Sequence, residues 1–277
     1  IIYLTISHTM NIMTKPKLPN IANEINTNGF FHYKNLISDE NCNKILSSLS
    51  LMKPAINIPY SNIAWGFGNL LEDPNFSCIY NNATIKEICE NYLSSDFVFN
   101  HLMVNNKVEW IGPGVEWHQE IFNVDTYAPG GNKKPNNWKN FLQVYIALDP
   151  HTLENGCLKV VPKSHELGVL PCEDIVNDLL NHKRRIPYDT MVDVNKKYPL
   201  KNVIMSPGDI LFFNHKFIHG SASNTSDKPR RSIVMQARLP YKRDEEIFAK
   251  ETKYRSDFVL KTLEKKILKI KSKNAYN

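Results

Sequence analysis

Residues 207–240, PGDILFFNHKFIHGSASNTSDKPRRSIVMQARLP, contain two apolar runs separated by turn-forming residues. Each run is short and rich in β-branched and aromatic residues, which is the pattern of a β-strand. Similar runs begin near residue 97 and are bounded by turns that contain Gly, Pro and Asn. Several short strands without repeated strand–helix alternation predict a mainly β fold, a sandwich or barrel, with its core over about 97–240.

Apolar residues at helical spacing predict helices before and after this core. One helical region lies within residues 20–52, where Ser38 precedes an amphipathic series and Gly29 marks a turn into a short strand. A second helix is predicted near residues 84–93. Residues 251–277 carry an apolar stripe among lysines, which predicts a basic helix packed on the core. The alternative for this last segment is a helix lying on a membrane surface.

The net positive charge of the chain comes from its C-terminal end. Its 277 residues are 42% hydrophobic and 22% charged, and the net charge is +6. Nine basic and three acidic residues follow position 249, so the preceding 249 residues are neutral. A neutral body has no electrostatic footprint for nucleic acid. No apolar run approaches the roughly 20 residues of a membrane span, so we expect no stable membrane insertion.

The length and the cysteines indicate a single intracellular domain. We expect one domain over residues 14–250, followed by the basic helix, with residues 1–13 a non-native or disordered start. Five cysteines, odd in number and without a CxxC pair, disfavour a disulfide framework or a zinc knuckle. A cytoplasmic monomer or homodimer is the simplest expectation.

The stretch EWHQEIF holds the first candidate metal ligands, His118 and Glu120, which a strand would project to one face. Taken alone, such a pair is more often exposed or hydrogen-bonded to itself. A third candidate is His219, with His215 as its best rival, because the even offset between them permits the same strand face. Two histidines and one carboxylate leave open coordination positions, as in non-haem Fe(II) oxygenases. Zinc more often has a closed site or only one open position.

Together these runs resemble the phytanoyl-CoA dioxygenase family. The resemblance rests on WHQE, LQVYIALDPHTLENGCLKVVPKSHELG and PGDILFFNHKFIHGSASNTSDKPRRS, and NTNGFFHYKNLISDENCNKIL is similar to the family's N-terminal opening. It implies a double-stranded β-helix (jelly roll, cupin-like) with flanking helices. It also implies an Fe(II)- and 2-oxoglutarate-dependent dioxygenase that uses O2, hydroxylates a small molecule, and releases succinate and CO2. Desaturation and ring closure are open alternatives for the outcome.

The resemblance assigns roles to particular residues. The family's metal ligands fall on His118, Glu120 and His219, and its cosubstrate arginine falls on Arg230. An arginine suits this role because its planar fork meets a carboxylate with two charged hydrogen bonds. The adjacent Arg231 should point to the opposite face of the strand.

Three further cosubstrate contacts are implied at Ser221, Gln119 and Tyr145. Each has a structural alternative: Ser221 caps a turn, Gln119 satisfies a buried backbone group, and Tyr145 belongs to the core. For His165 and Asp209 we expect support of turns rather than chemistry.

The family usually has Asp where this chain has Glu120. The extra methylene moves the carboxylate outward, whereas metal–ligand distances tolerate errors of only about 0.2 Å. Another rotamer or bidentate coordination would compensate. A second hypothesis is therefore a catalytically degenerate family member that binds metal or a small acid without turnover. Arg230 and the complete HGS of residues 219–221 favour the active oxygenase.

The motifs do not identify the substrate. We expect it to be selected by loops within residues 54–80, 123–138 and 173–200, the last of which is polar, irregular and long enough to cover a site. Side chains expected at the mouth, each with a scaffold alternative, are Lys107, Trp117 and Trp138.

Overall fold

The computed structural model describes residues 18–51, 63–65, 69–71, 73–94, 96–120, 141–175 and 184–240. The expected start over 1–13, the loop over 123–138 with Trp138, and the basic helix over 251–277 lie outside the described residues.

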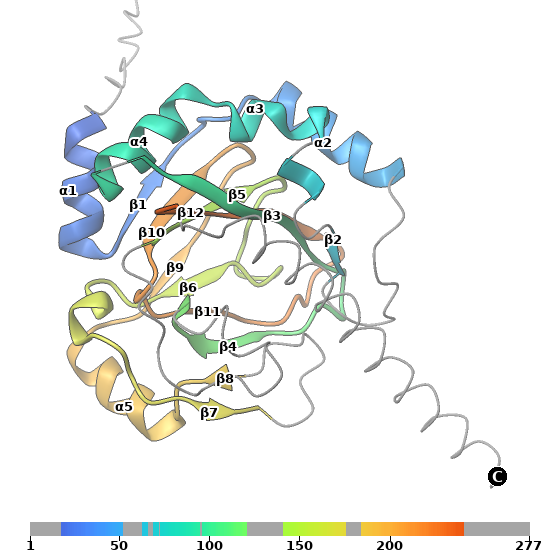
Figure 1. The fold of residues 1–277 in the computed structure, drawn as a ribbon. Coiled ribbons are helices and arrows are strands. Elements are labelled where there is room, and N and C mark those ends of the chain that lie inside the picture. Colours follow the sequence, from blue (N-terminus) through green and yellow to red (C-terminus); the bar gives the residue numbers. More distant parts are fainter. Residues whose placement is uncertain are drawn as a thin grey trace, which may run out of the picture.

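A six-stranded antiparallel sheet forms one half of the fold (Figure 1). Its strands, in spatial order, are β1 (Phe30–Tyr33), β10 (Ile210–Asn214), β5 (Phe141–Ala147), β12 (Arg230–Arg238), β3 (Val98–Lys107) and β2 (Ile63–Trp65). All seven residues of β5 are buried because both faces of this central strand are covered. The two apolar runs quoted above form β10 and β12, which pair with the two sides of β5.

A four-stranded antiparallel sheet forms the other half. Its strands, in spatial order, are β4 (Val115–His118), β11 (His219–Ser221), β6 (Leu158–Val160) and β9 (Lys201–Val203). One apolar cluster joins the two sheets, with Tyr145, Leu211 and Val234 from the larger sheet and Leu158 and Val160 from the smaller. Two facing antiparallel sheets confirm the predicted mainly β, jelly-roll core.

Helices cover the outer face of the larger sheet (Figure 1). They are α1 (Leu18–Asn28), α2 (Asp39–Leu51), the 3₁₀ turns η1 (Asn69–Leu71) and η2 (Pro74–Phe76), α3 (Ser77–Tyr80) and α4 (Ala83–Leu93). The Ser38 hydroxyl accepts a hydrogen bond from the Asn41 N–H at 3.3 Å at the start of α2. The Asn82 side chain accepts one from the Ile85 N–H at 3.1 Å and caps α4. The helices predicted before the core and the short strand among them are confirmed.

The segment 173–200, expected to be an irregular loop, contains regular structure. It holds the hairpin β7 (Glu173–Asp174) and β8 (Arg184–Arg185) and the helix α5 (Tyr188–Lys197), which follow the 3₁₀ turn η4 (Ser164–Leu167). The expectation was wrong because α5 has too few apolar residues to show a helical pattern in the sequence. Two of them, Met191 and Val194, are enough to hold the helix in place. They pack with Ile186 against Val161 and Ile218 on the outer side of the smaller sheet.

His215 and His219 do not share a strand, contrary to expectation. β10 ends at Asn214, and β11 begins at His219 in the other sheet. Asn214 closes the turn between them, because its side chain accepts a hydrogen bond from the Lys216 N–H at 2.8 Å and its carbonyl accepts one from the Phe217 N–H at 2.9 Å. Within the ranges described above, none of the helices is long and apolar enough to cross a membrane.

Candidate functional site

Three predicted ligands converge where β4 and β11 pair. His219 lies directly opposite His118, and Glu120 follows shortly after His118. Glu120 Oε1 is 3.5 Å from His118 Nε2 and 3.3 Å from His219 Nε2. The three ligand atoms lie within 4.8 Å of one another. Neighbouring ligands at right angles around a metal with bonds of about 2.1 Å are about 3 Å apart, so these residues fit one face of a metal ion.

Backbone carbonyls orient both imidazoles. His118 Nδ1 is 2.7 Å from the Glu116 carbonyl oxygen, and His219 Nδ1 is 3.0 Å from that of Phe217. With Nδ1–H donating to each carbonyl, the tautomer leaves the Nε2 lone pair free for a metal. The rings are also mutually close, with centroids 4.1 Å apart. The donor set of two neutral imidazoles and one carboxylate is the one expected for Fe(II).

Glu120 reaches the site from a position beyond the strand. β4 ends at His118, and the Glu120 N–H donates to the His215 carbonyl oxygen at 2.9 Å. Burial opposes ionisation of Glu120, but the adjacent His118 and His219 outweigh it and hold the pKa of its carboxyl well below the usual range. Burial, with the nearby His118, lowers the pKa of His219. A charged carboxylate and a neutral imidazole are the metal-binding forms of these groups.

Two buried cations face each other beside this centre. Arg230 of β12 lies directly opposite Lys107 of β3, and their side chains are 3% and 0% exposed. Arg230 Nη1 donates to the Gly156 carbonyl at 2.9 Å, whereas its Nε has no hydrogen-bond partner. Lys107 Nζ donates to Ser221 Oγ at 2.8 Å and also contacts the Ala222 carbonyl oxygen. Because Ser221 is two residues beyond His219, the cations and the metal centre are adjacent.

Neither Arg230 nor Lys107 has a carboxylate partner among the described residues. Burial, together with the charge of Arg230, lowers the pKa of Lys107 to about 6. A buried charge without a counter-ion is costly, so this pair favours an anionic ligand. Lys107 was expected at the mouth or in the scaffold. No sequence signal marks its proximity to Arg230, because only the register of β3 against β12 brings them together.

The three weaker cosubstrate candidates separate into two groups. Ser221 and Tyr145 are buried near the cations, and the Tyr145 hydroxyl has no hydrogen-bond partner. Burial raises the pKa of Tyr145, and the charge of Arg230 opposes that rise. Gln119 is different, because its amide nitrogen donates to the carbonyls of Gly168 at 2.8 Å and Lys216 at 2.7 Å. Its amide oxygen accepts a hydrogen bond from the Leu170 N–H at 2.9 Å. Gln119 therefore satisfies buried backbone groups, which matches its structural alternative.

The residues predicted to have structural roles have them. Arg231 faces away from Arg230 and forms a two-pronged ion pair with Asp149, with Nε–Oδ2 and Nη2–Oδ1 distances of 2.7 and 2.8 Å. Asp209 accepts hydrogen bonds from the N–H groups of Asn35 and Ser206 at 2.9 and 3.0 Å, as expected for a turn.

Three further aromatic side chains make structural contacts. His165 Nε2 is 2.8 Å from the Asn26 carbonyl oxygen, a contact that connects the 3₁₀ turn η4 to α1 and is a structural role as expected. His215 packs against Phe141 with ring centroids 5.0 Å apart, and among the described residues it belongs to no metal-ligand group. Trp117 packs against the cluster between the smaller sheet and α5, as its scaffold alternative predicts.

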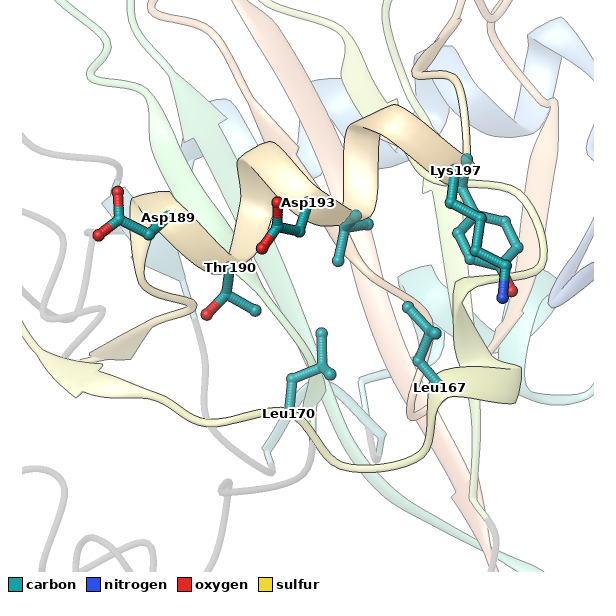
Figure 2. Close-up of a pocket in the computed structure, with 8 residues that line it drawn as sticks. Leu167, Leu170, Asp189, Thr190, Asp193 and Lys197 are labelled. Atoms are coloured by element: carbon teal, nitrogen blue, oxygen red, sulfur yellow. The ribbon is translucent and has the colours of Figure 1, made fainter.

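A groove of about 380 Å³ lies between α5 and the segment formed by the end of η4 and the residues that follow it (Figure 2). Leu167 and Leu170 line one side, and Asp189, Thr190 and Asp193 lie along the helix on the other (Figure 2). None of the predicted metal or cosubstrate residues lines this groove, so it is separate from the site described above.

Residues 25–232, about three quarters of the chain, match the sequence model of the family described as Phytanoyl-CoA dioxygenase (PhyH). The chain belongs to the phytanoyl-CoA dioxygenase family. Membership of this family confirms the resemblance inferred from the WHQE and HGS motifs. The matched range includes all three candidate metal ligands and Arg230.

Curated relatives and solved structures are similar to this family member over different lengths. Dioxygenase lolE1 of Epichloe uncinata is 34% identical over 95 residues, which cover 34% of this chain and 31% of that protein. The matches span about a third to a half of the first curated relatives.

The solved structures show the fold alone, because their identities are low. EvdO2 from Micromonospora carbonacea var. aurantiaca, complexed with 2-oxoglutarate, is 19% identical with a TM-score of 0.61, covering 86% of this chain and 93% of its own. EctD from S. alaskensis with bound Fe is 16% identical with a TM-score of 0.62, covering 84% and 80%.

Proposed function

We propose that this chain is an Fe(II)- and 2-oxoglutarate-dependent dioxygenase that oxidises a small molecule. The observation that carries the proposal is the adjacency of an open three-ligand set to two buried cations. The ligand set is His118, Glu120 and His219, and the cations are Arg230 and Lys107. A metal chelator that is also a dianion would satisfy both features, and 2-oxoglutarate is such a molecule.

Each side chain then has a defined task. His118, Glu120 and His219 would hold iron on one face and leave the opposite face for cosubstrate and O2. Iron, 2-oxoglutarate and O2 would together supply the oxidation of a substrate C–H bond. One oxygen atom would enter the substrate, and the other would enter the succinate that forms as the cosubstrate loses CO2. The protein's own contribution is to orient the reactants and to exclude water.

The cations would bind the far carboxylate of the cosubstrate. Arg230 offers a planar fork whose Nε has no other partner, and Lys107 offers an ammonium already aligned by Ser221. The unpartnered hydroxyl of Tyr145 is a further donor on the same inner face. A dianion here would supply the missing counter-charge and offset the cost of burying two cations.

The alternative is a degenerate family member that binds metal or a small acid without turnover. Glu120, in place of the family's usual Asp, is the observation that favours it. Against it, the Glu120 carboxylate lies within 3.5 Å of both imidazole nitrogens, and the cation pair is complete.

We also infer a cytoplasmic monomer or homodimer from the five free cysteines and the neutral body.

The proposal is tested by adding Fe(II) and 2-oxoglutarate without oxygen and recording the visible metal-to-ligand charge-transfer band. We expect a band in the wild type, and a loss of cosubstrate affinity of about a hundredfold in Arg230→Ala. Arg231→Ala is the matched control, because this arginine is paired with Asp149 on the other face; its band should persist. A folded, iron-loaded wild type without a band would refute the cosubstrate assignment.

Succinate release separates the enzyme from the degenerate alternative. With oxygen admitted, an active oxygenase should form succinate, and the rate should rise when a substrate from a compound panel binds. A chain that shows the band but never forms succinate above a Glu120→Ala background would be a binder rather than an enzyme.

A further inference from the structure

Two glutamines lie opposite each other on the inner face of the larger sheet. The register places Gln236 of β12 opposite Gln143 of β5, and Gln143 opposite Phe213 of β10. Directly opposed residues in antiparallel strands project to the same face. The Phe213 ring centroid is 4.8 Å from that of His219. The glutamine row, defined as Gln236, Gln143 and Phe213, therefore faces the metal centre.

The amides of this row are buried but not satisfied. Gln143 and Gln236 are each 1% exposed. Three of their atoms, Gln143 Oε1 and both Oε1 and Nε2 of Gln236, have no hydrogen-bond partner. Buried polar groups are nearly always paired, and an unpaired amide costs free energy that an apolar side chain of similar size would not. Several such atoms beside a candidate metal centre indicate that a bound ligand pairs with them.

The glutamine row is distinct from the cation pair. Gln236 is six residues beyond Arg230 on β12, which is about 20 Å along a strand. His219 contacts the row through Phe213, whereas Ser221, two residues on, contacts Lys107. The metal centre therefore lies between the cations, where the cosubstrate belongs, and the amides, where a substrate would lie.

The surroundings of the row determine which ligand group it suits. Phe141, two residues before Gln143, adds a second aromatic ring, and His215, packed on that ring, has an unpartnered Nδ1. Arg238, two residues beyond Gln236, is already engaged, since its guanidinium donates to the Leu239 carbonyl. Each glutamine amide presents a donor and an acceptor without net charge. The complementary group is neutral, planar, and both donates and accepts.

We propose that Gln143 and Gln236 bind the substrate through an amide or lactam group and hold it beside the metal. This assignment rests on the proposed oxygenase function for its catalytic meaning, but binding itself does not require iron. It makes the two glutamines specificity-determining residues for an amide- or lactam-containing small molecule.

The binding test compares 2-pyrrolidinone with γ-butyrolactone, which has the same ring without the N–H. Saturation-transfer NMR on the metal-free chain measures both affinities. We expect the lactam to bind wild type about tenfold or more better than the lactone, because a site built for a hydrogen bond rejects the analogue that lacks it. Gln143→Leu and Gln236→Leu should each remove most of this preference. Met235→Leu, a volume-conserving change next to Gln236 on the outer face, should retain it.

Thermal unfolding of the same variants distinguishes ligand binding from a structural role. Leucine removes unpaired amide atoms, so the melting temperature of the ligand-free Gln236→Leu variant should equal or exceed that of wild type. Equal affinity of wild type for lactam and lactone would overturn the proposal. So would a lactam preference that survives both substitutions, or a lowered melting temperature without loss of that preference.

The charge-transfer band keeps this test separate from the proposed function. Both glutamine variants should retain the band with Fe(II) and 2-oxoglutarate, because neither residue belongs to the metal or cation set. If the wild type gave no band, the proposed oxygenase function would be refuted. Lactam binding to the metal-free chain would still decide the role of the glutamines.

Discussion

Glu120 shows how a longer carboxylate is accommodated in this family member. It lies beyond the end of β4, where the backbone is no longer held in strand alternation, and its N–H is fixed by the His215 carbonyl. Its side chain extends to within 3.5 Å of both imidazole nitrogens. The backbone of residue 120 therefore lies at a distance from the two imidazoles that the length of a glutamate side chain spans.

From this geometry we predict that Glu120→Asp weakens iron binding. The shorter side chain withdraws its oxygens by more than the roughly 0.2 Å that metal–ligand bonds tolerate, and we expect about a tenfold loss of Fe(II) affinity. Anaerobic Fe(II) titration measures it. Glu116→Asp, on the same strand and hydrogen-bonded to the Tyr188 hydroxyl, is the control. Tighter binding in Glu120→Asp would instead identify an imperfect copy of the family's site.

Lys107 predicts a pH dependence of cosubstrate binding. Burial and Arg230 lower the pKa of Lys107 to about 6 in the ligand-free protein, and a bound carboxylate would raise it, so binding takes up a proton. Affinity should be highest at or below pH 6 and fall by up to about tenfold per pH unit above it. Calorimetry in buffers of different ionisation enthalpy measures the uptake.

The control for this pH dependence is a second lysine near the site. Lys107→Met should abolish the proton uptake, whereas Lys159→Met, on β6, should retain most of it, because the charge of Lys159 is only a minor cause of the lowered pKa of Lys107. Uptake that persists in Lys107→Met would assign the proton to another group. Below pH 6, where Lys107 is protonated, the same variant should unfold at a higher temperature than wild type without cosubstrate, because a buried cation without a carboxylate partner among the described residues has been removed.

Among the elements, the turn between β5 and β6 supports the cation pair. Gly156 has φ +74° and its carbonyl accepts the Arg230 hydrogen bond. A Cβ on Gly156 would lie 2.3 Å from the Ala222 carbonyl oxygen. Both the left-handed backbone and the close approach therefore require glycine at this point.

A matched pair of glycines tests this requirement. Gly168 has a similar φ of +70°, but a Cβ there would meet nothing within 4 Å. Gly168→Ala should lower the free energy of unfolding by about 1–3 kcal/mol, because its φ of 70° with ψ of −148° is a backbone conformation that essentially only glycine adopts. Gly156→Ala should lower it by at least about 2 kcal/mol more, because of the close contact. Urea denaturation measures both. Only Gly156→Ala should also weaken 2-oxoglutarate binding; equal effects of the two changes would exclude the close contact as the cause.

Elements with long, periodic apolar patterns could be predicted from the sequence, and short ones could not. The helices before the core and the longer strands of the larger sheet carry enough apolar residues to show their period. β2 does not, and it lies within residues 54–80, where we expected a loop. α5 was not predicted because its two buried apolar residues, Met191 and Val194, stabilise the helix only through contacts with residues distant in the sequence. The break between β10 and β11 escaped because the apolar pattern continues through Phe217 and Ile218, which are buried in the turn.

At the scale of the whole molecule, the metal would join parts of the chain about a hundred residues apart. β4 and β11 are brief strands, and a bound ion would link them beyond their few backbone hydrogen bonds. Fe(II) at a hundred times its dissociation constant should raise the free energy of unfolding by about 2.7 kcal/mol. Anaerobic thermal unfolding with and without chelator measures this gain.

Two histidine variants show whether the gain comes from this site. His219→Gln should lose it, because one of three ligands is removed. His215→Gln should retain it, since this buried histidine lies outside the ligand group. Equal loss in both variants would indicate that iron stabilises the chain elsewhere.

The sequence by itself determined the β-rich core, the flanking helices and the residue types of the metal centre, because these depend on local periodicity and on short motifs. The family resemblance pointed to Arg230, and strand alternation added that the neighbouring Arg231 should face the opposite way. Only the tertiary structure decided that Lys107 lies against Arg230 and that Gln143 lies against Gln236. Such pairs depend on the register between strands distant in the chain, and no local pattern encodes that register.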